Sequence, residues 1–267
     1  MKPTFFAQNN SKSHNQAEKD RVSPNQLSEK SNNQAMQKFY CQKFLETIQL
    51  DYTMAGHPSL ARWVINSIQV NDGEQDTHFL FVSEGSVTLK SSNGEFLLRE
   101  NSFATVPGNF SLDGSGQVLV ATLLNYTGFF SIGGPIEPLG RLKYIDGCSA
   151  TVLINPLKLG EPCLNFLYVP PGISQTPHTH PSLRIGLVAS GSGTCTVDEG
   201  IFEMEEGTVF CLPENKLHSF SAIDDSLRII IYHPDSEVGP TDDSHTMLNN
   251  TFVGEKSAQV LDAIRTK

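Results

Sequence analysis

The sequence predicts an all-β protein built as two β-barrels in tandem. Two observations predict this: short runs rich in Val, Ile, Phe and Thr alternate with Gly, Pro, Asn and Asp, and the arrangement of these runs repeats along the chain. Short β-rich runs separated by frequent turn residues are typical of sandwiches and barrels. A length of 267 residues is sufficient for two small domains.

The expected strands are short and fall into two groups. Each combines β-branched or aromatic residues with flanking turn residues. The first group is 63–70, 78–82, 86–90, 95–99 and 102–106, and the second is 164–169, 184–190, 193–197, 201–204, 208–212, 218–222 and 227–232.

The N-terminal end has a different composition. Residues 1–37 hold eleven Asn and Gln and few large apolar side chains. Such a segment cannot bury enough surface to offset its ordering entropy, so we expect a disordered tail. Near-helical spacing of apolar residues then predicts a short amphipathic helix over 37–48. The expected domains are the tail (1–37), an N-terminal barrel (38–135) and a C-terminal barrel (136–267).

An internal repeat supports the tandem arrangement. A shift of 106 residues places Gly85 on Gly191 and Pro107 on Pro213, and this register continues without a gap for about forty residues. The chain therefore reads as a duplication of one β-unit, joined by a Gly- and Pro-rich connection that begins at 128–140.

The charge balance restricts the partners. The chain has 29 acidic and 19 basic residues and a net charge of −10, which argues against nucleic acids and anionic membranes. No apolar run is long enough for a membrane helix, and the N-terminus lacks the features of a secretory signal. The five cysteines are odd in number and have no CxxC spacing, as in reduced cytosolic proteins. We expect a cytoplasmic protein with a small-molecule ligand.

Three histidines in the second copy suggest a metal site. His178 and His180 are two residues apart, so in a strand their side chains share a face. His218, from a neighbouring strand, can meet them inside a small barrel. Three neutral imidazoles suit Fe, Zn, Ni, Cu or Mn and leave coordination positions open. The alternative is that the three side chains have no metal partner.

The segments around these histidines resemble the two sequence motifs of the cupin superfamily. The segments are PPGISQTPHTH and GTVFCLPENKLH. The matching residues are Gly172, His178, His180, Gly191, Gly207, Pro213 and His218. The sequence departs from the motifs at Arg184, where the family has a ligand Glu, at Asn215 for a Gly and at Ala222 for an Asn. The whole chain resembles a bacterial bicupin, which implies two jelly-roll-like barrels with one divalent metal inside the C-terminal one.

The missing Glu bears on the expected chemistry. Three neutral imidazoles leave the full 2+ charge on the ion, which suits a chelating anionic substrate. Cupins with a similar three-His arrangement include iron(II) dioxygenases of thiols, diketones and ring-hydroxylated aromatic acids. The resemblance therefore implies a mononuclear Fe(II) dioxygenase of a small anionic substrate, with Zn, Mn, Ni and Cu as other candidate metals. The alternatives are a non-redox metal-dependent isomerase, lyase or hydrolase, and a non-catalytic small-molecule-binding barrel.

Arg184 and His233 are the candidate catalytic residues. Arg184 lies four residues after His180, so alternation places it on the interior face, where a guanidinium can bind a carboxylate bidentately. Pro181 could instead turn Arg184 toward a surface acid. His233 follows the expected strand 227–232 and could act as a base at the barrel mouth, although strand-end histidines are often simply solvated.

The first copy has lost the histidine pattern. The same shift places Asp72 and Glu74 at the first two His positions, His78 at the Glu position and Leu112 at the last His position. Leu112 cannot bind a metal. Asp72, Glu74 and His78 could form an oxygen-rich site, but the local sequence favours a polar turn. The first barrel is then expected to be a structural or dimerising partner, which leaves a homodimer open.

Overall fold

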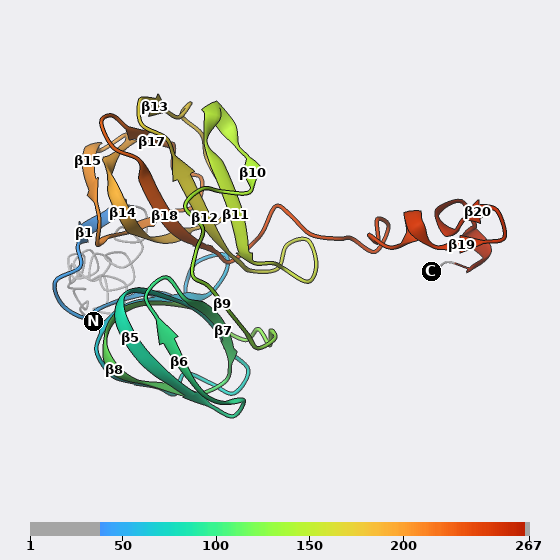
Figure 1. The fold of residues 1–267 in the computed structure, drawn as a ribbon, viewed down its shortest axis with the longest axis horizontal. Helices are drawn as coiled ribbons and strands as arrows, with labels where there is room; N and C mark the ends of the chain where they lie inside the picture. The colour runs from blue at the N-terminus through green and yellow to red at the C-terminus, as the bar shows by residue number, and fades with distance from the viewer. Residues whose placement is uncertain (1–37, 265–267) are drawn as a thin grey trace, which may run out of the picture. The chain divides into compact units, whose positions relative to one another are not determined.

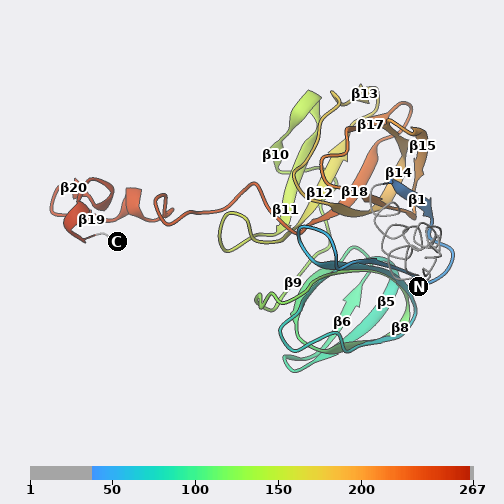
Figure 2. The ribbon, with the colours of Figure 1, turned by 180° about the vertical axis from the view of Figure 1, so that it is seen from behind.

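The computed structural model describes residues 38–264. Over this range the regular structure is almost entirely β, with only short 3₁₀ turns besides. Two large sheets form, one of 8 strands and one of 10, and each curves around its own interior (Figures 1 and 2). The predicted all-β, two-barrel fold is therefore confirmed. The predicted disordered tail, residues 1–37, lies outside the described residues.

The 8-stranded sheet forms the N-terminal barrel. Its strand order is β2-β3-β8-β5-β7-β9, with β4 paired to β8 and β6 paired to β5. Its core is a buried apolar cluster that includes Leu89, Phe110 and Leu112. The strands are β2 (Ile48–Tyr52), β3 (Ser59–Ile65), β4 (Ile68–Val70), β5 (Thr77–Ser91), β6 (Gly94–Arg99), β7 (Phe103–Pro107), β8 (Phe110–Leu123) and β9 (Ser131–Gly133).

The 10-stranded sheet forms the C-terminal barrel. Its main strand order is β1-β16-β14-β18-β12-β11-β10, and β17 bridges β13 and β14. Phe210, Phe220 and Ile229 belong to its own buried cluster. The strands are β1 (Tyr40–Lys43), β10 (Leu142–Lys143), β11 (Ser149–Ile154), β12 (Cys163–Val169), β13 (Ile173–Ser174), β14 (Arg184–Val197), β15 (Gly200–Glu205), β16 (Thr208–Leu212), β17 (His218–Ala222) and β18 (Leu227–His233).

The helix predicted over 37–48 is absent, because the described part of this segment is extended. Strand β1 pairs with β16, so this early segment completes the C-terminal sheet, and Ile48 already begins β2 of the other sheet. Phe39, Phe44 and Ile48 are all buried, as their spacing indicated. Phe39 and Phe44 flank β1 and Ile48 begins β2, so they reach the core from an extended segment rather than from one helical face, because pairing with distant strands outweighs local periodicity.

The repeat is visible in the strand pairing. His78 pairs with Val106, and its counterpart Arg184 pairs with Leu212, which keeps the shift of 106 on both strands. The following hairpins keep the same register: Ser86 faces Arg99 and Ser192 faces Glu205. The duplicated unit is thus the same antiparallel ladder built twice.

The register then changes by two residues. The turn from Pro107 to Phe110 is two residues shorter than the turn from Pro213 to His218. Consequently Phe110 pairs with the end of β5 as His218 pairs with the end of β14. The counterpart of His218 is therefore Phe110, and the predicted equivalence with Leu112 was wrong.

The partner strands shift in the same way. Phe110 lies directly opposite Val70, and His218 lies directly opposite His178. Val70 therefore takes the place of His178. Asp72, two residues further on, takes the place of His180 rather than that of His178 as the uniform shift predicted.

The remaining elements are short. A 3₁₀ turn, Ile145–Gly147, precedes β11. After β18 the chain continues into a small hairpin of β19 (Phe252–Val253) and β20 (Lys256–Ser257), with 3₁₀ turns at Leu248–Asn250, Ala258–Val260 and Asp262–Ile264. Among the described residues, none of the helical segments has the length and apolar character needed to cross a membrane.

Candidate metal centre

A backbone bridge brings two of the three histidines together. The N–H of His178 donates to the carbonyl of His218 at 2.9 Å, and the N–H of His218 donates back at 3.0 Å. Residues that exchange both hydrogen bonds in an antiparallel pair lie directly opposite each other, with their side chains on one face. Their ring centroids are accordingly 4.5 Å apart.

The third histidine is held by the turn that precedes β17. The N–H of Asn215 donates to the carbonyl of His180 at 2.7 Å. Asn215 has a φ of 57°, a left-handed conformation that Asn tolerates better than most residues. The His180 ring lies 5.1 Å from the ring of His178 and 5.3 Å from that of His218.

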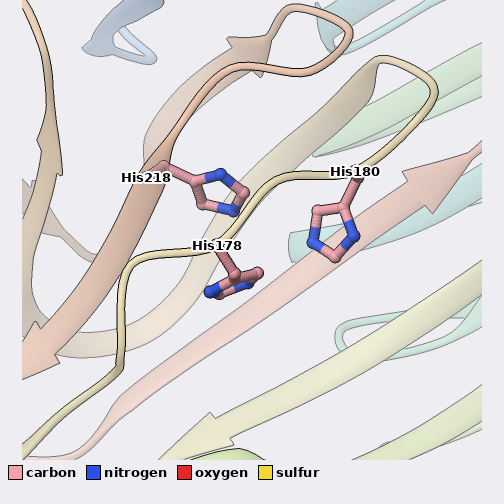
Figure 3. A group of neighbouring side chains, drawn as sticks. All are labelled: His178, His180 and His218. Carbon is pink, nitrogen blue, oxygen red and sulfur yellow. The ribbon is translucent and has the colours of Figure 1, made fainter.

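The three rings point into one space (Figure 3). One potential ligand atom from each lies within 4.8 Å of the others. In two rings, Nδ1 faces a backbone carbonyl at 2.9 Å: Thr176 for His178 and Lys216 for His218. In the third, Nδ1 of His180 faces Oε1 of Glu237 at 3.6 Å. A carbonyl acceptor at Nδ1 of His178 and His218 favours the tautomer that leaves Nε2 free as a ligand.

Burial favours the neutral form of His180 and His218. Burial, followed by the charge of Arg184 and the proximity of His218 and His178, lowers the pKa of His180 to about 3. Burial is also the main cause that lowers the pKa of His218 to about 4. Neutral imidazole is the form that binds metal, so the protein presents these two donors in the competent state at neutral pH.

The histidines open onto a cavity of about 210 Å³. Much of its lining is apolar and includes Leu142, Val152, Phe166, Phe220 and Ile231. A cavity of about 150 Å³ suffices for benzene. The space next to the histidines is therefore suited to a ligand with one ring or a chain of similar size.

Arg184 lies in the wall of this cavity and does not turn to the surface. The residue is 2% exposed. Its Nη1 donates to the carbonyl and hydroxyl of Ser182 at 3.0 and 2.7 Å. Within the described residues, its buried Nε and Nη2 lack hydrogen-bond partners. The nearest anion is the carboxylate of Glu237, 3.7 Å from Nη2, beyond hydrogen-bond range. A buried guanidinium with two unsatisfied nitrogens favours an anionic ligand.

His233 also lines the cavity. Its Nε2 lies 3.2 Å from the side-chain nitrogen of Asn165, and its ring lies 6.1 Å from that of His180. Burial, followed by the charges of Arg184 and His180, holds the pKa of His233 well below its usual value. This environment makes His233 a neutral polar group of the cavity wall rather than a solvated strand end.

The cavity wall contains polar residues that the sequence analysis did not single out, among them Glu237 and Gln175. Glu237 reaches His180 and Arg184 from the segment after β18. Gln175 directly follows β13 and also lines the cavity. Glu237 follows His233 by four residues in the polar run HPDSE. The sequence signal that could have identified Glu237 was an acidic residue just beyond a strand that ends at the barrel mouth.

The corresponding residues of the N-terminal barrel do not form a site. Asp72 accepts two hydrogen bonds from Arg62, both 2.7 Å, and Glu74 accepts one from Asn109 at 2.8 Å. His78 is 0% exposed and contacts Thr122. In residues 38–264, His178, His180 and His218 are the only group of metal-ligating side chains that converges. The predicted polar turn is what the structure shows for residues 71–76.

Comparison with known proteins supports this fold. Residues 170–246 match a family model described as the AraC-like ligand-binding domain. No curated protein matches the sequence.

Solved structures resemble the chain in fold at low identity. A cupin 2 conserved barrel domain protein from Leptotrichia buccalis is 15% identical, with a TM-score of 0.52, over 73% of this chain and 91% of that one. Protein YlbA from E. coli is 16% identical, with a TM-score of 0.55, over 76% and 94%. Salicylate 1,2-dioxygenase from Pseudoaminobacter salicylatoxidans, in a structure of its adducts with gentisate, is 10% identical, with a TM-score of 0.56, over 82% and 92%. At these identities the likeness shows that the chain shares the fold of these proteins, and the family model matches within its C-terminal barrel.

Proposed function

We propose that His178, His180 and His218 hold one divalent metal ion, and that the adjoining cavity binds a small organic anion. The observation that carries the proposal is the convergence of three imidazoles, two of which direct Nδ1 to backbone carbonyls at 2.9 Å while the third lies beside the Glu237 carboxylate. Such acceptors orient the rings of metal-binding histidines and raise their basicity. The donor set therefore fits a first-row divalent metal.

The charges around the cavity favour an anionic ligand. Three neutral imidazoles leave the full charge on the ion, and Arg184 adds a second positive charge in the same wall. Nη2 and Nε of Arg184 can each donate to a carboxylate, which would satisfy their missing hydrogen bonds. The apolar wall would receive the rest of the ligand. We propose that Arg184 anchors the anion.

We propose that the protein is a mononuclear Fe(II) dioxygenase that oxidises this ligand. The bound iron would supply redox chemistry with O₂ next to the substrate. Salicylate 1,2-dioxygenase, which shares the fold and has been studied with gentisate, supports this choice. In our proposal Arg184 orients the substrate, His233 acts as a proton acceptor in the cavity wall, and the apolar residues exclude water.

Metal analysis is the first test. Protein purified without air or chelator should contain about one metal per chain, with iron predominant. After reconstitution with Fe(II), addition of gentisate as the first probe should start O₂ consumption. The protein could contain stoichiometric metal and yet consume no O₂ with gentisate or with a panel of thiol and aromatic acids. That result would contradict the dioxygenase assignment but not the proposed metal site. Absence of bound metal would overturn the proposal.

A ligand-binding function without turnover is the second candidate. The observation in its favour is the match of residues 170–246 to the AraC-like ligand-binding domain. This function predicts saturable binding of the anion, metal present or absent, with no chemical change in the ligand. A non-redox metal-dependent reaction would instead convert the ligand under argon. Product analysis with and without O₂ separates these outcomes.

A further inference from the structure

The three histidines differ in how their rings are supported. His178 and His218 direct Nδ1 to carbonyls of their own segments, Thr176 and Lys216. His180 directs Nδ1 to a side chain, Glu237, from a segment that follows β18. The position of Glu237 therefore depends on what holds that segment, which we call the strap and define as residues 235–237.

The N-terminal barrel contacts the first residue of the strap directly. Nε2 of His57, in the β2–β3 loop, lies 3.7 Å from a carboxylate oxygen of Asp235. Both side chains are partly exposed, at 38% and 28%. This contact connects the N-terminal barrel to the strap two residues before Glu237.

A second connection passes through Glu161. The hydroxyl of Tyr126, at the end of the N-terminal barrel, donates to the Glu161 carboxylate at 3.3 Å. The backbone of Glu161 accepts from the N–H of Ser236 at 3.0 Å, and the N–H of Gly160 donates to the Ser236 carbonyl at 3.1 Å. Ser236 is 3% exposed. The residue adjacent to Glu237 is thus buried and bonded on both sides to a loop that Tyr126 contacts.

The β2–β3 loop of the N-terminal barrel, which carries His57, also supports the backbone of His180. The N–H of Gly56 donates to a carboxylate oxygen of Glu214 at 2.9 Å, and a Cβ at position 56 would lie 2.9 Å from that oxygen. The next residue, Asn215, donates to the carbonyl of His180. His180 is therefore supported by the N-terminal barrel at its backbone and at its ring, whereas His178 and His218 support each other.

We infer that the N-terminal barrel positions the metal centre, because it holds the strap that brings the Glu237 carboxylate to His180. Glu237 is then a positioning residue that acts through His180. The inference rests on the proposed metal site and assigns a role to the barrel that has no site of its own.

Co(II) binding to the full chain tests the inference. Two variants are compared with wild type: Glu237→Gln, and His57→Gln combined with Tyr126→Phe, which alters only N-terminal barrel residues. The measurements are affinity, by competition with a chelating dye, and the visible absorption bands, which report ligand geometry. Glu255→Gln, an exposed site that also loses one negative charge, is the matched control.

Glu237→Gln should weaken Co(II) binding about tenfold and shift the bands, as for other residues that orient metal-bound histidines. The His57/Tyr126 variant should weaken binding roughly twofold to tenfold, the range for one hydrogen bond. It should have no further effect in the Glu237→Gln background, because both changes act on the same contact. The control should match wild type. If the combined variant does not fold, Tyr126→Phe alone replaces it.

Contrary results separate the two proposals. If wild type binds Co(II) and the His57/Tyr126 variant has the same affinity and spectrum, the inference is overturned but the proposed metal site is retained. Additive effects in the Glu237→Gln background would also overturn it, because the barrel would then act by another route. If wild type binds no Co(II), both proposals fail.

Discussion

At the same position of the antiparallel strand pairing, one barrel carries polar metal-ligating side chains and the other carries apolar side chains. In the C-terminal barrel His178 and His218 face each other across a backbone bridge. In the N-terminal barrel Val70 and Phe110 face each other at the matching position, and both are 2% exposed. One backbone arrangement thus supports either a ligand set or a close-packed core, and the side chains decide between them.

The buried arginines show the same contrast. Arg62 is bonded bidentately to Asp72, so the N-terminal barrel satisfies this guanidinium internally. Arg184 is as well buried but lacks hydrogen bonds at Nε and Nη2 within the described residues. The buried charge of Arg62 is compensated within the protein, whereas Nε and Nη2 of Arg184 are available to a ligand.

The largest expected effect comes from truncating the two counterparts, His218 and Phe110. His218→Ala should abolish stoichiometric metal binding and leave the melting temperature of the apoprotein nearly unchanged. Phe110→Ala should cost about 3–5 kcal/mol of unfolding free energy, because it leaves a cavity in the core, and should retain one metal per chain. Metal analysis and urea denaturation measure both. Full metal occupancy after His218→Ala would contradict the comparison.

This pair also shows what could be predicted from the sequence. The spacing of His178, His180 and His218 predicted their convergence. The assumed strand alternation is not its cause, because His178 and His180 lie in the irregular segment between β13 and β14. The equivalence of His218 and Phe110 could not be predicted in the same way. A two-residue difference in turn length is visible only when strand pairing is known.

Contacts between distant segments were the other limit. Strand β1 pairs with β16 at the edge of the C-terminal sheet, and the local sequence of 40–43 does not indicate which sheet it joins. Glu237 likewise reaches His180 through the strap, whose place depends on the loop around Glu161 and on the other barrel. Periodicity describes individual strands well, but carries no information about which loops meet.

The second prediction concerns the Arg62–Asp72 pair. Asp72→Asn should destabilise the protein by about 3 kcal/mol, because it leaves the Arg62 charge buried without its partner. Lys90 and Asp113 form an ion pair of 3.0 Å in the same barrel, but both are exposed. Asp113→Asn should therefore cause no measurable change in urea denaturation. Equal effects of the two substitutions would mean that the buried pair has no special structural role.

The third prediction concerns Arg184. Arg184→Gln should weaken gentisate binding to the metal-loaded protein by about 1.5–3 kcal/mol, the contribution of a charge-assisted hydrogen bond. Hydroquinone, which has the same ring without the carboxylate, should be affected much less. Unlike Asp72→Asn, the substitution should not lower stability, since it removes a buried charge whose Nε and Nη2 lack hydrogen bonds within the described residues. Calorimetry with both ligands provides the measurement. Equal losses for the two ligands would exclude a specific contact with the carboxylate.

The smallest effect is expected from His78, the counterpart of Arg184. His78 is fully buried, and its Nδ1 lies 2.8 Å from the Thr122 hydroxyl. Its pKa is lowered from 6.5 to about 4, mainly by burial; the carboxylates of Asp72 and Asp76 oppose this shift, and the charge of Arg62 adds to it. The folded protein therefore keeps this imidazole neutral under mildly acidic conditions in which the unfolded chain would protonate it.

The sign of the pH dependence follows from proton linkage. Above pH 6.5 both states are neutral at His78, and the linkage has no effect. As the pH falls from 6.5 toward 4, only the unfolded state gains the proton, so stability declines, by about 2 kcal/mol between pH 7 and pH 5. His78→Asn keeps a hydrogen-bonding group for Thr122 but cannot titrate. Its apoprotein should lose about 2 kcal/mol less than wild type over this interval in urea denaturation. Parallel pH profiles for the two proteins would show that the N-terminal barrel accommodates a charged imidazole, and so that its interior is less apolar than the Val70–Phe110 pairing indicates.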